Sequence, residues 1–126
     1  MYRVKRGNMN TIIYMRTVPG KPLHRALTKP LQITTMDGGV TEIPVGFEWD
    51  GSSVPWLFNG VFPRHRHPIA SCKHDWRCLH AKSPAERKWA DKQFEIDVGK
   101  TSWWITKKLG YYGVRIGAYL GIGCHY

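Results

Sequence analysis

Short alternating runs of apolar and polar residues mark the first half of the chain. Leu31 to Thr35 alternates up to the turn-forming run Asp37-Gly38-Gly39, and Val40 to Ile43 resumes the alternation, a pattern typical of a β-hairpin. Two further short strands are predicted at residues 11–16 and 45–49. We therefore expect residues 1–55 to form mostly strands and turns.

The second half instead carries the helical period of about 3.6 residues. Pro68 suits the first position of a helix, which we expect to end at about Ala81. Its apolar residues fall at helical spacing and are Ile69, Cys72, Trp76 and Leu79. His74 lies toward the edge of that apolar stripe, so the pattern alone does not place it in the core.

A second helix is predicted from the run Ser83-Pro84-Ala85-Glu86, which has the form of a capping box with Ser83 as the cap. Gly99 is expected to end this helix. Asp91 and Phe94 are three residues apart and share a face, and Arg87 is placed to pair with Asp91 at the spacing of i and i+4.

A third helix is expected to begin near Trp103. Gly113, Gly117 and Gly121 recur at four-residue spacing along it, which predicts close packing against a sheet or a neighbouring helix. Residues 68–124 are therefore mostly helical. Strands followed by helices predict an α+β fold, in which a small N-terminal antiparallel sheet is covered by about three C-terminal helices within a single domain, residues 1–126.

The charge balance predicts an anionic partner. The chain has 19 Lys and Arg against nine Asp and Glu, a formal charge of +10, which attracts nucleic acid, anionic lipid or acidic wall polymers. The basic residues are scattered rather than clustered. The longest apolar stretch, Tyr111 to Tyr126, carries Arg115 and is too short for a membrane span, so no transmembrane segment is expected.

The three cysteines argue against a disulfide framework. They are Cys72, Cys78 and Cys124, an odd number in a chain large enough to fold without such bonds, and this favours synthesis and residence in a reducing cytoplasm. Cys72 and Cys78 fall on different faces of the first helix. We expect both to be buried as small hydrophobic residues rather than to share a metal.

The residues with the clearest chemical potential are His74 and Asp75 on the first helix and Asp91 on the second. A histidine with one carboxylate beside it and another opposite can act as a general base, or can bind a divalent cation together with the carboxylates. The same three residues can equally form a buried polar clamp between two helices. Asp50, in the turn Asp50-Gly51-Ser52-Ser53, is a further candidate.

These residues belong to three segments that together resemble an uncharacterised bacteriophage and prophage family, a domain of unknown function. That family has a G-F-x-T-D-G-A-S-V-P segment, a helical H-D and a later A-D-x-x-F. The matching segments here are Gly46 to Pro55, Ala70 to Asp75 and Ala90 to Phe94. The resemblance implies a phage origin and a shared site. The chain departs from the family where Arg77-Cys78 replaces a Leu-Tyr pair, which removes a tyrosine from the site.

Three hydrolytic mechanisms fit such a site. One resembles secreted phospholipase A2 enzymes, in which the histidine activates water, the adjacent aspartate holds calcium and the distant aspartate orients the imidazole; His74, Asp75 and Asp91 would take these roles. A second resembles metal-dependent phosphohydrolases with an H…H-D…D pattern and would recruit His65 or His67 together with Asp91 or Asp97. A third is hydrolysis of a cell-wall bond, with His74 as base and Asp50 or Asp75 as its partner.

A basic loop between the strands and the helices is a candidate polyanion-binding patch, because arginine and protonated histidine bind anionic oxygens. Its residues are Arg64, His65, Arg66 and His67. The alternative is an ordinary exposed loop.

The function predicted from the sequence is that of a virion- or lysis-associated phage protein with a His/Asp hydrolytic site directed at cell wall or lipid. The alternative is a non-catalytic structural or assembly component whose basic surface contacts neighbouring phage subunits, DNA or the host envelope. In both cases the chain is made in the host cytoplasm and associates with the virion.

Overall fold

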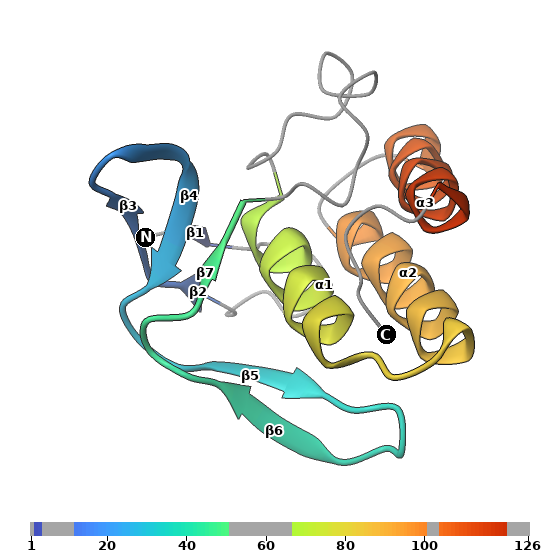
Figure 1. The fold of residues 1–126 in the computed structure, drawn as a ribbon, viewed down its shortest axis with the longest axis horizontal. Helices are drawn as coiled ribbons and strands as arrows, with labels where there is room; N and C mark the ends of the chain where they lie inside the picture. The colour runs from blue at the N-terminus through green and yellow to red at the C-terminus, as the bar shows by residue number, and fades with distance from the viewer. Residues whose placement is uncertain (1, 4–11, 51–66, 101–103, 121–126) are drawn as a thin grey trace.

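In the computed structural model, the described residues are 2–3, 12–50, 67–100 and 104–120, and they form short strands followed by three helices (Figure 1). The strands are β1 (Tyr2–Arg3), β2 (Ile12–Ile13), β3 (Met15–Val18), β4 (Lys21–Leu27), β5 (Leu31–Thr34), β6 (Val40–Ile43) and β7 (Glu48–Trp49). The helices are α1 (Pro68–His80), α2 (Pro84–Gly99) and α3 (Trp104–Tyr119). The predicted α+β fold is confirmed.

The strands form three small antiparallel sheets rather than one. Strand β1 pairs with β2, β4 lies between β3 and β7, and β5 pairs with β6. The last pair is the predicted hairpin, with Leu31 opposite Ile43 and Ile33 opposite Thr41. Gly38 at its turn has a φ of 89°, a conformation that glycine adopts without steric cost.

Strand β4 is the element that the apolar pattern did not predict. Its outer residues are exposed and only Ala26 and Leu27, at its end, are buried, so almost no alternation is visible along it. Backbone pairing with β3 and β7 on both sides holds it in place instead. The predicted strand at residues 45–49 shortens to β7, because Gly46 at a φ of 92° belongs to a turn in which Phe47 N donates to Pro44 O.

The three helices follow one another away from the strands, and only α1 has extensive contact with a sheet. Helix α1 packs on β7, α2 packs on α1, and α3 packs on α2 (Figure 1). Gly113 and Gly117 on α3 are buried, as expected for close packing against a neighbour; Gly121 lies outside the described residues. None of the described helices has the length and apolar character that crossing a membrane requires.

The capping residue of α2 is as predicted. Ser83 Oγ accepts a hydrogen bond from Glu86 N at 3.3 Å. The side chain of Glu86 reaches back as expected, but its Oε2 accepts from Lys82 N, at 2.5 Å, rather than from the cap residue itself. Whether the donor is Lys82 N or Ser83 N, the Glu86 carboxylate accepts from a backbone N–H that precedes the first turn of the helix.

Helix α1 is buried on two sides and separates two cores. Ile69 and Cys72 join a cluster of strand residues, which are Ile13, Leu27, Leu31, Ile33, Ile43 and Trp49, and Trp76 packs against that cluster. Ala70 joins a second cluster with Phe94, Val98 and Val114 of the other helices. Leu79, predicted on the apolar stripe, is instead 65% exposed, because the ring that follows Trp76 on this face is that of His80.

The cysteines depart from expectation at one position. Both Cys72 and Cys78 are buried, and Cys72 is free. Cys78, however, is disulfide-bonded, so its interpretation as a reduced, purely hydrophobic residue is wrong.

Candidate functional site: a buried His–Asp pair between two helices

His74 and Asp91 meet in the interface between α1 and α2. Nε2 of His74 donates to Oδ1 of Asp91 at 2.6 Å. The His74 residue is 1% exposed and Asp91 is fully buried. The pair forms because α1 presents a second buried face, with His74 one turn after Ala70, toward the face of α2 that carries Asp91 and Phe94. The ring of Phe94 lies 5.1 Å from that of His74, centroid to centroid.

Two arginines hold the carboxylate of Asp91 from the other side. Nε of Arg87, one turn earlier on α2, donates to Oδ1 at 3.0 Å, and Nη1 of Arg115 on α3 donates to Oδ2 at 2.8 Å. Arg87 also donates through Nη2 to the carbonyl of Val114 at 3.0 Å. Asp91 thus joins all three helices and cannot rotate without breaking charge-assisted hydrogen bonds.

The second nitrogen of His74 is oriented toward Asp75. Nδ1 lies 3.9 Å from Asp75 Oδ1, which is longer than a hydrogen bond. The side chain of Asp75 is 14% exposed, and it is therefore the member of the trio with the most contact with solvent. The predicted convergence of His74, Asp75 and Asp91 is present in the structure.

The protonation of His74 follows from these neighbours. Burial alone lowers the pKa of this imidazole, but the facing carboxylates of Asp75 and Asp91 outweigh burial, and the pKa lies above its ordinary value of 6.5. The protonated form is the one that both carboxylates stabilise. When His74 is protonated, it and the two arginines share the negative charges of Asp91 and Asp75.

We expect the free energy of unfolding to decrease as pH rises above about 6.5, through the titration of His74. Because the folded-state pKa exceeds the unfolded value, the folded chain binds more protons in that window. The stabilisation is complete below the unfolded pKa and is lost as pH rises through the folded pKa, by about 1.4 kcal/mol for each unit between the two. Urea unfolding of the wild type and of His74→Gln between pH 6 and 9 measures it; an equal pH dependence in both would contradict the assignment.

Asp50 lies at the end of β7, where its Oδ2 is 3.9 Å from Nε2 of His24 on β4. Both side chains are about one-third exposed. The preceding Trp49 is anchored to α1, because its Nε1 donates to Oγ of Ser71 at 3.1 Å. The structure therefore gives Asp50 a histidine neighbour that sequence reasoning missed, and its predicted part in the His74 site stays a prediction.

The predicted polyanion patch falls mostly outside the described residues, which exclude Arg64, His65 and Arg66. His67 is described and is 6% exposed, immediately before α1, where its carbonyl accepts from Ser71 N. Asp97, the other candidate for a phosphohydrolase pattern, pairs with Arg77 and Lys100. Polyanion binding at this loop remains a prediction.

The residues that the structure describes contain no complete set of metal ligands. Among them, no three His, Cys, Asp or Glu side chains converge as a metal site would require. Of the two carboxylates beside His74, that of Asp75 is the more exposed, and one carboxylate with waters is a common way to hold a hard cation. A divalent cation at this position therefore stays a prediction.

Sequence reasoning found the Arg87–Asp91 pair but missed Arg115. The signal for Arg115 was its position as the one Arg, Lys, Asp or Glu in the apolar stretch from Tyr111 to Tyr126, since a charge in such a stretch favours an anionic partner. Both arginines donate hydrogen bonds to Asp91, in addition to the one from His74.

Comparison with known proteins gives one match. The model of a family described as a protein of unknown function, DUF1353, matches residues 25–114. This range includes the three helical residues of the trio, Asp50 and Arg87, and it ends one residue before Arg115. No curated protein and no solved structure matches the chain.

Proposed function

The chain belongs to the DUF1353 family, and for this member we propose a phage-associated hydrolase in which His74 is the general base. The observation that carries the proposal is the 2.6 Å hydrogen bond from His74 Nε2 to an Asp91 held by two arginines. An imidazole oriented through one nitrogen by a fixed carboxylate has the other nitrogen available for a proton. Here that nitrogen is Nδ1, beside Asp75.

The reaction we propose is attack by water on an ester or glycosidic carbon. His74 Nδ1 takes a proton from the water as its oxygen bonds to the carbon, and the same proton is then given to the leaving oxygen. Asp91 stabilises the imidazolium formed in the first step. Asp75, as the partly exposed carboxylate at Nδ1, would position the water, directly or through a divalent cation.

The raised pKa of His74 sets the conditions for this chemistry. A general base must be unprotonated, so activity rises with pH as the imidazole loses its proton, above the ordinary value of 6.5. A cation bound at Asp75 would offset that carboxylate's charge and lower the pKa of His74. Added cation should therefore move the rise of activity to lower pH.

The substrate class we propose is an anionic component of the host envelope, either cell wall or lipid. The +10 formal charge supports it, since a basic protein accumulates at acidic polymers and anionic bilayers. A virion- or lysis-associated phage protein acts on such a surface. The resemblance of three chain segments to a phage family supports this setting.

Product release from two substrates tests the proposal. Purified wild type is incubated with dye-labelled peptidoglycan and, separately, with phosphatidylglycerol vesicles, between pH 6 and 9, with added calcium or with a chelator. We expect release from one of them, and a loss of about 10²–10⁴-fold in His74→Asn. Asp75→Asn should also lose activity, whereas Glu42→Gln, a carboxyl substitution on the exposed face of β6, should retain it.

A second candidate function is favoured by the burial of the pair. His74 is 1% exposed and Asp91 is fully buried. In this second function the network joins the three helices of a phage component that has no catalytic activity. The basic surface of such a component would contact neighbouring subunits, DNA or the host envelope.

The same experiment distinguishes the two candidates. If the wild type releases no product under any condition, while His74→Asn lowers the melting temperature, the hydrolase proposal is abandoned in favour of the structural role. Activity that persists at wild-type level in His74→Asn would also reject His74 as the base.

A further inference from the structure

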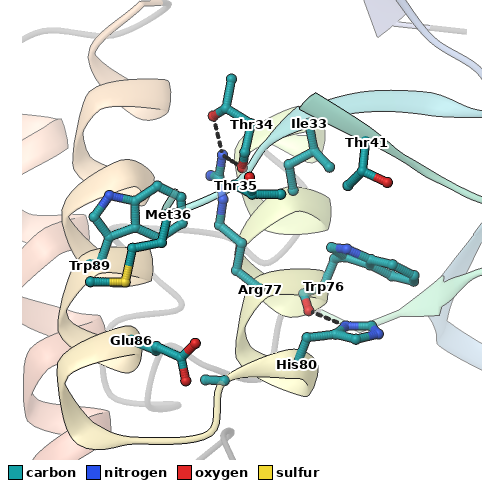
Figure 2. A pocket seen from close by; sticks show the side chains of 11 residues that line it. Ile33, Thr34, Thr35, Met36, Thr41, Trp76, Arg77, His80, Glu86 and Trp89 are labelled. Atoms are coloured by element: carbon teal, nitrogen blue, oxygen red, sulfur yellow. Dashed lines mark hydrogen bonds between the residues drawn. The ribbon is translucent and has the colours of Figure 1, made fainter. Parts of the chain in front are cut away.

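A groove separate from the His–Asp pair opens where the hairpin β5–β6 meets the end of α1 and the start of α2. It encloses about 200 Å³. Figure 2 shows Trp89 of α2 on one side of Arg77 and Trp76 of α1 on the other, with threonines of the hairpin at one end and Glu86 at the other. Both tryptophans are partly exposed.

Arg77 forms part of the groove wall, with Nη2 hydrogen-bonded inside the protein, whereas its buried Nε and Nη1 have no hydrogen-bond partner among the described residues. Its Nη2 donates to the carbonyl and the hydroxyl of Thr34, at 3.1 and 3.0 Å, and Nη1 lies 3.5 Å from Asp97. The guanidinium also lies 4.9 Å from the centre of the Trp89 ring. Arg77 therefore attaches the hairpin to the helices and fixes the position of Trp89.

The remaining groups of the groove are aromatic surface, hydroxyls and one carboxylate. His80 extends the aromatic wall, because its ring lies 4.1 Å from that of Trp76. Thr35 and Thr41 contribute hydroxyls at the hairpin. Glu86 accepts from Lys82 N through Oε2, which leaves its other oxygen to accept from a ligand.

We propose that this groove binds a neutral sugar ring. A pyranose presents an apolar C–H face suited to an indole and a ring of hydroxyls suited to threonine and carboxylate groups, and pockets of this kind combine aromatic walls with a few directed polar groups. Phosphate is disfavoured because Glu86 is anionic and because the charge of Arg77 is already paired with Asp97. A quaternary ammonium is disfavoured because the Arg77 guanidinium lies in the wall.

The groove and the His–Asp pair are independent sites on different faces of α1. His74 faces Asp91 of α2, whereas Arg77 faces Thr34 of β5. Sugar binding does not require that His74 be catalytic, so the failure of one proposal leaves the other standing. If both hold, the groove would retain the protein on a glycan surface.

The test is titration of the purified full chain with three probes, the methyl β-glycosides of N-acetylglucosamine, glucose and galactose. Tryptophan fluorescence and NMR saturation transfer report binding. A ligand of this size is expected to bind with a Kd of about 1 mM. We expect Trp89→Ala to weaken binding by at least about tenfold. Tyr119→Ala removes an aromatic ring that is 91% exposed on α3 and should leave it unchanged.

A second variant, Thr41→Arg, tests the proposal even if Trp89→Ala does not fold. Thr41 is exposed on β6, so Thr41→Arg should fold normally and fill the mouth of the groove. The proposal is supported if one glycoside binds the wild type and both groove variants weaken it. It is overturned if none of the three binds at about 20 mM, if binding survives in Thr41→Arg, or if tetramethylammonium or inorganic phosphate binds more tightly than the sugars.

Discussion

Replacing Asp91 by Asn is expected to lower the free energy of unfolding by about 3–5 kcal/mol. The substitution keeps the shape of the side chain and removes its charge. Asp91 is fully buried and accepts from His74, Arg87 and Arg115. Its loss leaves Arg87 and Arg115, and the imidazole of His74 when protonated, without a counter-charge, and the amide nitrogen of Asn adds a donor where only acceptors fit.

Urea unfolding monitored by circular dichroism measures this effect, provided that the slope against urea is unchanged. Glu42→Gln is the control, because it removes a carboxylate from an exposed position on β6 and should change stability by less than about 0.5 kcal/mol. A loss below about 1 kcal/mol in Asp91→Asn would mean that the arginines find other partners. The interpretation of Asp91 as the residue that links the three helices would then be wrong.

The second large effect is expected from Phe94→Ala, at about 3–5 kcal/mol. Phe94 is 2% exposed and belongs to the core cluster that joins α2 to α1 and α3. Its ring also covers one side of His74. Truncation removes buried apolar surface and opens a cavity beside the imidazole.

Two comparisons isolate the packing effect. Phe94→Leu retains most of the volume and should cost less than half as much, and Tyr119→Ala deletes an aromatic ring that is 91% exposed and should be close to neutral. Thermal unfolding of the set gives the order. Equal stability of Phe94→Ala and Tyr119→Ala would contradict the assignment of Phe94 to the helical core.

Much of the fold was predictable because its determinants are local. Pro68 and the Ser83 cap set where α1 and α2 begin, and the Asp37-Gly38-Gly39 turn sets the hairpin, since each acts through backbone geometry within a few residues. The pairing of Arg87 with Asp91 is local too, at one helical turn. Strand β4 was missed because backbone pairing with distant strands, rather than its own side-chain pattern, stabilises it.

The residues of the candidate site could be predicted from the sequence, but their burial and their neighbours could not. The order of the motifs indicated that His74, Asp75 and Asp91 would converge, and the structure brings them together. The burial of the pair, the contribution of Arg115 from a third helix and the His24 neighbour of Asp50 were not visible. Each depends on how elements distant in sequence are arranged, and no local spacing specifies that.

The sequence by itself determined the α+β class, the starts of α1 and α2 and the pair of helices that carry the histidine and the aspartate, because propensity, capping and periodicity act over short distances. Only the tertiary structure decided that α1 is buried on two sides, which places His74 inside, against the carboxylates that raise its pKa. It also decided that Arg77 links the hairpin to the helices and thereby forms the groove beside Trp76 and Trp89. Burial and electrostatics are sums over neighbours from the whole chain, and they exist only once the chain has folded.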